Sequence, residues 1–355
     1  MKEIGTDYPY RATLQCFLDT LKLPFPYYDL TQPNNLIDLY TSTDPFAFAM
    51  RLVSVLTLIH YVVSEITKNY SQVDKSWSIL PVVYAWHFTL HHYFNHGYFH
   101  PRLLLATILI TLWGSRLTYN FARKGGYRWS GQDYRYPYLL EKLGKTKFAL
   151  LNLTLIAPFQ DFLLLFMVSP LYIIYQFDAF TLTMSDIVVT IVFLGFLLLE
   201  TVADEQQYVF QTEKHALLNH VESKNQLKGD YKLGFLWHSG IFQYSRHANF
   251  FAEQCMWWTI YLFSLVATTQ YEGKSFLTVQ HWMNWSIVGP FVLTLLFQGS
   301  TWLTEVIINE NHCIFTWSTL KQNFFLFPVC NFLILNDNRK FLPRNIQNTR
   351  PTVRL

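Results

Sequence analysis

Long apolar runs are the feature of this sequence that most restricts its fold. A helix needs about 20 mostly apolar residues to cross the roughly 30 Å hydrocarbon core of a membrane. The chain also carries only 14% charged residues, against about 25% in soluble globular domains. The runs that approach or reach spanning length are 45–66, 77–95, 102–122, 148–176, 186–209, 249–269 and 285–308. We therefore predict an all-α, polytopic membrane helix bundle with about seven transmembrane helices.

The domain organisation follows from these runs. Residues 1–44 predict a non-membrane lead-in, 45–335 a membrane domain, and 336–355 a basic cytoplasmic tail. The fourth run contains Pro158 and Pro170, so we expect a kinked or tilted helix there. A further apolar stretch, 314–335, is compatible with an eighth span or with a segment in the membrane interface.

The placement of Lys and Arg gives the bundle an orientation. These residues gather in 123–147, in 210–248 and in the tail, and the positive-inside rule places all three segments on the cytoplasmic side. Seven spans then put the N-terminus in the lumen and the C-terminus in the cytoplasm. The net charge of +3 gives no indication of a nucleic-acid partner, and membrane lipids are the expected surroundings.

A polar stripe marks the start of the sixth run, in the sequence SRHANFFAEQCMWW (245–258). On a helix, Arg246, Asn249, Glu253 and Trp257 would lie on one face. Asn249 can donate and accept, which suits an amide ligand, and the guanidinium of Arg246 suits a phosphate. A buried Glu253 should face the protein interior. The structural alternative is a hydrogen-bonded contact between helices with an Arg at the membrane surface.

Two other segments carry polar groups toward the same predicted side. In ETVADEQQYVFQTEK (200–214), Glu200, Asp204 and Gln207 share a helix face, as a ligand site or as an internal salt-bridge network. In LWGSRLTYNFARKGGYRWSGQDYRY (112–136), a basic, aromatic, Gly-containing loop could wrap a phosphorylated ligand. The alternative for this loop is a surface attracted to anionic lipid head groups.

These three blocks, together with VDKSW at 73–77, resemble the signature blocks of the DUF1295 group. That group belongs to the superfamily with the steroid 5-alpha-reductase C-terminal domain. The resemblance covers roughly 73–328, with a weaker match from Glu305 to Pro328. It implies a seven-helix membrane fold with a cytoplasm-facing pocket for NADPH, and residence in the endoplasmic reticulum.

The resemblance also implies a reaction and a set of site residues. The reaction is hydride transfer to a carbon–carbon double bond conjugated with a carbonyl, in a lipid-soluble substrate such as a sterol, steroid or enoyl lipid. The implied catalytic acid is Glu253, and Asp74 is a second candidate because it begins a predicted span near the cytoplasmic side. The predicted cofactor-binding residues are Arg116, Asp133, Tyr134, Arg135, Glu200, Asp204, Gln207, Arg246, His247 and Asn249.

Departures from the family pattern leave alternatives open. The usual RHPNYFGE is RHANFFAE here, with Ala248 for Pro, Phe250 for Tyr and Ala252 for Gly. One alternative is a membrane methyltransferase of the isoprenylcysteine or phospholipid type, which binds S-adenosylmethionine. Another is a non-catalytic lipid-binding relative that has kept the fold.

A run of histidines, WHFTLHHYFNHGYFH (86–100), raises a third alternative. Imidazoles at such spacings are typical iron ligands. Such di-iron enzymes carry several separated histidine boxes, whereas this chain has one, and the predicted topology places it on the outer side. We therefore predict no metal site here and interpret these histidines as interfacial residues.

Overall fold

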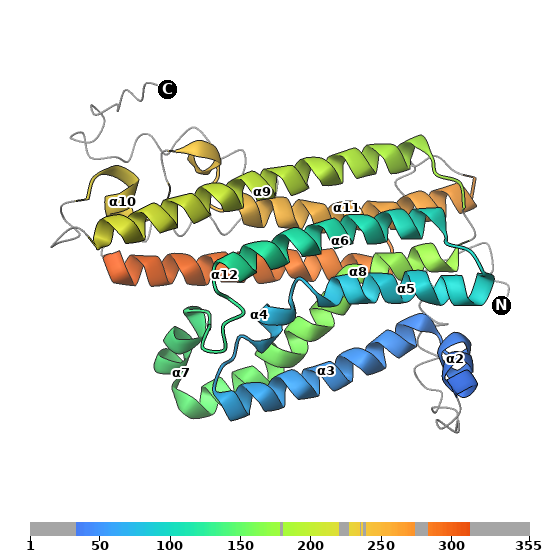
Figure 1. Ribbon diagram of the computed structural model, residues 1–355, viewed down its shortest axis with the longest axis horizontal. Helices are drawn as coiled ribbons and strands as arrows, with labels where there is room; N and C mark the ends of the chain where they lie inside the picture. The colour runs from blue at the N-terminus through green and yellow to red at the C-terminus, as the bar shows by residue number, and fades with distance from the viewer. Residues whose placement is uncertain are drawn as a thin grey trace. The chain divides into compact units, whose positions relative to one another are not determined.

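The computed structural model describes residues 33–177, 180–219, 227–234, 236, 239–273 and 283–312, and all regular elements in these ranges are helical (Figure 1). In chain order they are α2 (Pro33–Ser42), α3 (Pro45–Thr67), α4 (Gln72–Ser76), α5 (Leu80–His96), α6 (Pro101–Arg123), α7 (Arg135–Leu151), η1 (Asn152–Phe159), α8 (Gln160–Gln176), α9 (Met184–Leu218), α10 (Gly229–Leu233), η3 (Gly240–Gln243), α11 (Ala248–Tyr271), η5 (Trp285–Ile287) and α12 (Val288–His312). The predicted all-α class is confirmed.

Each predicted span coincides with a helix or a helical run, and four of these are long and apolar enough to cross a membrane. The four are Pro45–Thr67, Arg135–Gln176, Met184–Leu218 and Trp285–Thr304. The other three are more polar or shorter: α5 has 17 residues and several histidines, while α6 and α11 carry buried charged or amide side chains. The chain is thus a membrane protein, and the count of seven crossings stays a prediction. The proposed eighth segment, 314–335, and the tail, 336–355, lie outside the described residues.

One face of α3 shows what the spanning helices present to lipid. Val55, Leu58, Ile59, Val62 and Ile66 are all exposed, from 42% to 76%. Their spacing places them on one side of the helix, whereas Phe46, Ala49 and Val53 on the same helix are fully buried. An exposed apolar stripe of this kind, on a helix long enough to span a membrane, fits the hydrocarbon of the bilayer.

Local sequence signals account for where the helices begin and end. Pro45 occupies the first turn of α3, where a missing N–H costs nothing, and Asp44 caps that turn by accepting from Ala47 N at 2.9 Å. Helix α6 begins in the same way, with Pro101 in the first turn and the His100 side chain accepting from Leu103 N. Helix α5 is capped after its last residue by Gly97, which has φ +80°, the left-handed conformation that glycine adopts most easily.

The fourth predicted span is irregular, as its prolines indicated. Helix α7 bends at Gly144, whose φ of 75° lies outside the helical region. The chain then forms the π-helical segment η1, which contains Pro158, before α8 resumes the α-helical path. A proline inside a helix removes a backbone donor and crowds the preceding turn, so the hydrogen-bond register shifts there. Pro170 lies within α8 without ending it.

The chain divides into two compact units. The first contains Met1–Leu198 and Glu253–Thr304, and the second contains Leu199–Ala252 and Glu305–Leu355. In the first unit α3, α5, α6 and α8 pack side by side (Figure 1). Phe46 is central to this core, with its ring 5.2 Å from Tyr172, 5.3 Å from Trp285 and 6.2 Å from Phe88.

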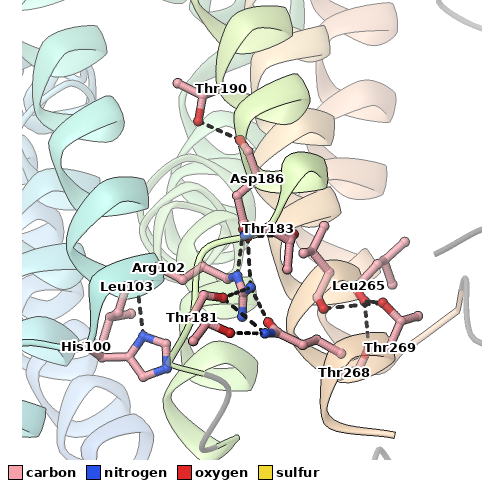
Figure 2. Close-up of polar contacts among 12 residues, drawn as sticks. His100, Arg102, Leu103, Thr181, Thr183, Asp186, Thr190, Leu265, Thr268 and Thr269 are labelled. Atoms are coloured by element: carbon pink, nitrogen blue, oxygen red, sulfur yellow. Dashed lines mark hydrogen bonds and ion pairs between the residues drawn. The ribbon is translucent and has the colours of Figure 1, made fainter. Parts of the chain in front are cut away.

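A buried ion pair ties the start of α6 to the start of α9 within the first unit. Arg102 and Asp186 are both 0% exposed, with Nε–Oδ1 at 2.6 Å and Nη2–Oδ2 at 2.8 Å. Arg102 also donates to the Thr181 carbonyl, as Figure 2 shows. Gln270 Oε1 accepts a further hydrogen bond from Arg102. The N–H and hydroxyl of Thr183 both donate to Asp186. The pair is therefore surrounded by hydrogen bonds, which is the condition under which a buried ion pair is tolerated.

Replacing Arg102 with Met should destabilise the protein by about 3–5 kcal/mol, because the Asp186 carboxylate would stay buried without its cation. The apparent melting temperature of the detergent-solubilised protein measures this. Arg123→Met, at the other end of α6 and partly exposed, is the matched control and should cost less than about 1 kcal/mol. Equal melting temperatures for Arg102→Met and wild type would contradict the assignment.

Candidate functional site

Asp204 and Asn249, which the sequence predicted to share a site, contact each other in the second unit. Asn249 Nδ2 donates to Asp204 Oδ1 at 3.4 Å. Asp204 comes from the middle of α9 and is 5% exposed, whereas Asn249 is the second residue of α11 and is partly buried. Two residues 45 positions apart thus place an amide next to a carboxylate, a combination that can both donate to and accept from a ligand.

The predicted helical stripe at 246–257 needs one correction. Arg246 lies in the turn before α11, because the helix begins at Ala248. The first hydrogen bond of the helix runs from Phe251 N to the His247 carbonyl at 3.0 Å, so His247 is the capping residue. The His247 ring stacks on Phe250, with centroids 5.6 Å apart. The helical spacing that the sequence assigned to Arg246 therefore does not apply to it.

Gln206 is a residue of this unit that sequence reasoning missed. Its Oε1 accepts from Ile241 N at 2.9 Å and so holds the loop before α11 against α9. The neighbouring Gly240 has φ +60°, which favours glycine, and a Cβ there would lie 2.2 Å from Gln206 Oε1 and displace the Gln206 amide. The predicted residues Glu200 and Gln207 also lie on α9, Glu200 buried and Gln207 partly buried.

Glu253 belongs to the first unit and contacts the VDKSW block. It is 7% exposed, and its Oε1 accepts from Trp77 Nε1 at 3.4 Å. The sequence predicted that a buried Glu here would face protein, and the structure bears this out. Because Glu253 and Asp204 lie in different units, a shared cavity between them stays a prediction.

Asp133 and Arg135 form an ion pair at the start of α7. Arg135 Nε donates to Asp133 Oδ1 at 2.8 Å and Nη2 to Oδ2 at 2.9 Å, a bidentate arrangement. Asp133 N also donates to Ser71 Oγ, and Arg135 Nη1 donates to Ser300 Oγ on α12. The pair thus links the loop after α6 to two other parts of the first unit.

Asp74 lies beside this pair, on the five-residue helix α4. Tyr136 donates its hydroxyl to Asp74 Oδ1 at 3.3 Å, while Oδ2 is buried with no hydrogen-bond partner among the described residues. Burial, and after it the negative charge of Asp133, raise the pKa of Asp74 to about 6 against the opposing effect of Arg135. A carboxyl group that titrates near neutral pH can act as a general acid, which is the role the sequence predicted.

The other two predicted residues of the first unit lie at its surface or edge. Tyr134 is 56% exposed, and its hydroxyl donates to Thr304 Oγ1 at 3.4 Å. Arg116 is partly buried in the second half of α6. Their part in a cofactor site stays a prediction.

The histidines of 86–100 bond mainly to protein carbonyls. His87 Nε2 lies 2.8 Å from the Pro45 carbonyl and His91 Nε2 lies 3.0 Å from the Thr43 carbonyl. His92 and His96 use Nδ1 on the carbonyls of Tyr98 and His92. Within the described ranges no group of three His, Cys, Asp or Glu side chains is placed to hold a metal ion. The His87 and His91 rings thus join α5 to the segment around Thr43 and Pro45 at the start of α3.

A family model described as "Protein of unknown function (DUF1295)" matches residues 60–313. The chain belongs to the DUF1295 family. The matched range contains every predicted site residue named above, from Asp74 to Glu253. A DUF1295 assignment therefore agrees with the resemblance that the sequence blocks indicated.

An uncharacterised protein of Schizosaccharomyces pombe is 33% identical to this DUF1295 chain over 310 residues. The similarity covers 84% of this chain and 83% of the yeast protein, so the two are alike over most of their length. No solved structure matches the chain.

Replacing Asp74 with Asn should make stability less dependent on pH. An Asp whose pKa is raised on folding favours the folded state most below about pH 4, and this contribution is lost as pH rises through about 6. The loss amounts to about 3 kcal/mol above pH 7 for a shift of this size. Asp74→Asn should therefore raise the apparent melting temperature at pH 7.5 and change it little at pH 4.5. A melting temperature that responds equally at both pH values would argue against a strained carboxylate.

Proposed function

We propose that this DUF1295 protein is a membrane oxidoreductase that uses NADPH to reduce a carbon–carbon double bond conjugated to a carbonyl in a lipid-soluble substrate. The observation that carries the proposal is the contact between Asn249 and Asp204. Both positions match cofactor-contacting positions of the steroid reductases that the sequence blocks resemble. An ionisable side chain buried in a helix that is apolar enough to span a membrane supports the assignment of a functional site.

The residues of the second unit fit the chemistry of a nicotinamide dinucleotide. Asn249 and the carboxylate of Asp204 offer the donor and acceptor that a carboxamide needs. Arg246, in the turn before α11, offers a planar guanidinium to a phosphate. When bound, NADPH would supply a hydride to the β-carbon of the substrate.

The first unit, taken by itself, holds the two acids that the sequence predicted to be catalytic. Asp74 has a pKa raised to about 6, so it exchanges protons readily at neutral pH. Glu253 is buried next to an indole donor, Trp77. Either group could donate a hydrogen bond to a carbonyl oxygen and stabilise the negative charge that develops there.

The membrane location favours a substrate that dissolves in lipid. The exposed apolar faces of the spanning helices keep the protein in the bilayer, where sterols, steroids and enoyl lipids partition. Residence in the endoplasmic reticulum, where many such lipids are made, belongs to the same proposal.

Asn249→Ala and Asp204→Asn should each weaken NADPH binding at least about tenfold, equivalent to about 1.4 kcal/mol. Binding of NADPH to the protein in detergent, followed by fluorescence and by thermal shift, measures this. Asn95→Ala, an exposed Asn→Ala change at the end of α5, is the matched control and should leave the affinity unchanged.

The same assay distinguishes the alternatives. Stabilisation of the wild-type protein by S-adenosylmethionine and not by NADPH would replace the reductase with a methyltransferase. No response to either cofactor would favour a non-catalytic relative. Comparison of lipids from cells with and without the protein should show pairs that differ by the mass of two hydrogens if reduction is the reaction.

A further inference from the structure

Two tryptophans in the core of the first unit have no hydrogen-bond acceptor for their indole N–H groups among the described residues. Trp113 of α6 is 1% exposed and Trp257 of α11 is 2% exposed, and the nitrogen atoms of both rings are buried. Other indoles of this unit are paired, since Trp86 Nε1 and Trp258 Nε1 each donate to a threonine hydroxyl at 3.1 Å. Because the bundle does supply acceptors to such rings, the missing acceptor at Trp113 and Trp257 requires an explanation.

The two rings contact each other, but this contact cannot satisfy both of them. The Trp113 and Trp257 rings pack edge to face, with centroids 4.9 Å apart and an angle of 80° between their planes. In this geometry the N–H of one ring can point at the π face of the other, which is a weak hydrogen bond. The ring that presents its face cannot return this contact. At least one indole N–H is therefore left for another acceptor.

A third buried donor, the hydroxyl of Tyr84 on α5, lies at the same height in the bundle. Tyr84 is 0% exposed, and its oxygen has no hydrogen-bond partner in the part of the chain that the structure describes. The hydrogen bond from Trp86 to Thr111 fixes the register of α5 against α6. Its donor lies two residues after Tyr84, and its acceptor lies two residues before Trp113. Because the two helices run antiparallel (Figure 1), these equal steps bring Tyr84 and Trp113 to one level.

Helical geometry also places Tyr84 and Trp113 on the same side of the α5–α6 pair. The two helices face each other along hydrogen bonds that include those of Thr89 and Thr118. Tyr84 lies five residues before Thr89, and Trp113 lies five residues before Thr118, so both are turned from the shared contact by the same angle. In antiparallel helices, equal turns lead to the same side of the pair. Helix α8 packs against both helices, and Trp257 meets Trp113 on this side.

The chemistry of the three donors selects the kind of atom that would satisfy them. An indole N–H can donate and cannot accept. A bound water molecule would bring two protons of its own, and the Tyr84 oxygen could accept only one of them. A carbonyl oxygen brings two lone pairs and no proton. If one indole N–H points at the neighbouring ring, the other indole and the Tyr84 hydroxyl match these two lone pairs.

We propose that the first unit binds a lipid-soluble ketone, whose carbonyl oxygen accepts hydrogen bonds from Tyr84 and from the Trp113–Trp257 pair. The three residues all belong to this unit. The remainder of such a ligand is apolar and can reach a membrane bundle from the bilayer. None of the donors gains or loses a proton, so the binding does not depend on the proposed reduction or on a cofactor.

Photolabelling with benzophenone tests this site, because benzophenone is an apolar ketone that on irradiation attaches to C–H groups next to its carbonyl oxygen. The whole chain in detergent is irradiated with increasing benzophenone and digested, and mass spectrometry locates the label. We expect saturable labelling within about one turn of Tyr84, Trp113 or Trp257. Tyr84→Phe and Trp113→Phe should each raise the concentration for half-saturation at least about fivefold, because each removes one hydrogen bond to the probe.

Matched controls separate the hydrogen bond from the fit of the ring. Trp86→Phe and Trp258→Phe remove indoles that already donate to threonine hydroxyls, and each should keep half-saturation within about twofold of wild type. Excess diphenylmethane, which has the two rings of benzophenone without the oxygen, should compete poorly for the label. Tyr84→Phe removes a single oxygen atom from a core side chain, so this variant should fold even if the tryptophan variants do not.

Stability measurements provide a second readout. Without benzophenone, Tyr84→Phe should melt at or above the wild-type temperature, because the variant no longer buries an unpaired hydroxyl. With benzophenone, the melting temperature should rise more for wild type than for Tyr84→Phe. An equal rise in the two proteins would show that this hydroxyl does not bind the ketone.

The remaining outcomes also decide the proposal. Label confined to lipid-facing residues such as Leu58 and Ile59 of α3, or no saturable label at all, would overturn it. So would equal half-saturation for wild type, Tyr84→Phe and Trp113→Phe. Binding of NADPH to the same samples is measured separately. A protein that takes the label and does not bind NADPH would keep this site and lose the reductase, and the reverse result would do the opposite.

Discussion

A membrane helix bundle can hold an ionisable side chain only if another group compensates its charge, and this constraint organises the first unit. Arg102 and Asp186 satisfy it, since they bond to each other and Arg102 also donates to Thr181 and Gln270 while Asp186 accepts from Thr183. Asp74 satisfies it only in part, with one carboxylate oxygen unpaired among the described residues. The difference separates a contact that stabilises the fold from groups that are available for chemistry.

The short helix α4 and the residue that follows it contact polar groups on three other helices. Asp74 accepts from Tyr136, Ser76 meets His60, and Trp77 donates to Glu253. Three residues of the VDKSW block therefore contact three separate helices, α7, α3 and α11. A single turn of helix has a side chain on every side, so one short element can hold several polar groups inside an otherwise apolar unit. This arrangement gives a physical reason for the block that carried part of the family resemblance.

The lengths of the apolar runs predicted the positions of most helices. They did not predict which residues far apart in the sequence contact each other. The span at 45–66 was found within one residue of α3, because a long apolar run that begins with Pro is typical of a spanning helix and its first turn. The family resemblance assigned Asp204 and Asn249 to one site, and the structure shows that the two side chains are in contact. No local sequence pattern indicates that His60 pairs with Asp161, because the two lie 101 residues apart. The sequence shows only that Asp161 is an unusual residue inside an apolar run. Arg246 was misplaced because the spacing argument assumed a helix two residues before it begins.

The altered RHANFFAE block is compatible with a working site once its residues are placed on the helix. Ala248 is the first residue of α11, where the backbone N–H has no partner within the helix, so Pro and Ala are interchangeable at little cost. Ala252 is fully buried, and its methyl group is accommodated in the packing. Phe250 keeps the aromatic ring that stacks on His247 and loses only a hydroxyl. The substitutions therefore fall on positions that shape the start of the helix. The chain retains the amide of Asn249 and the carboxylate of Glu253, and the proposed chemistry is assigned to these two groups.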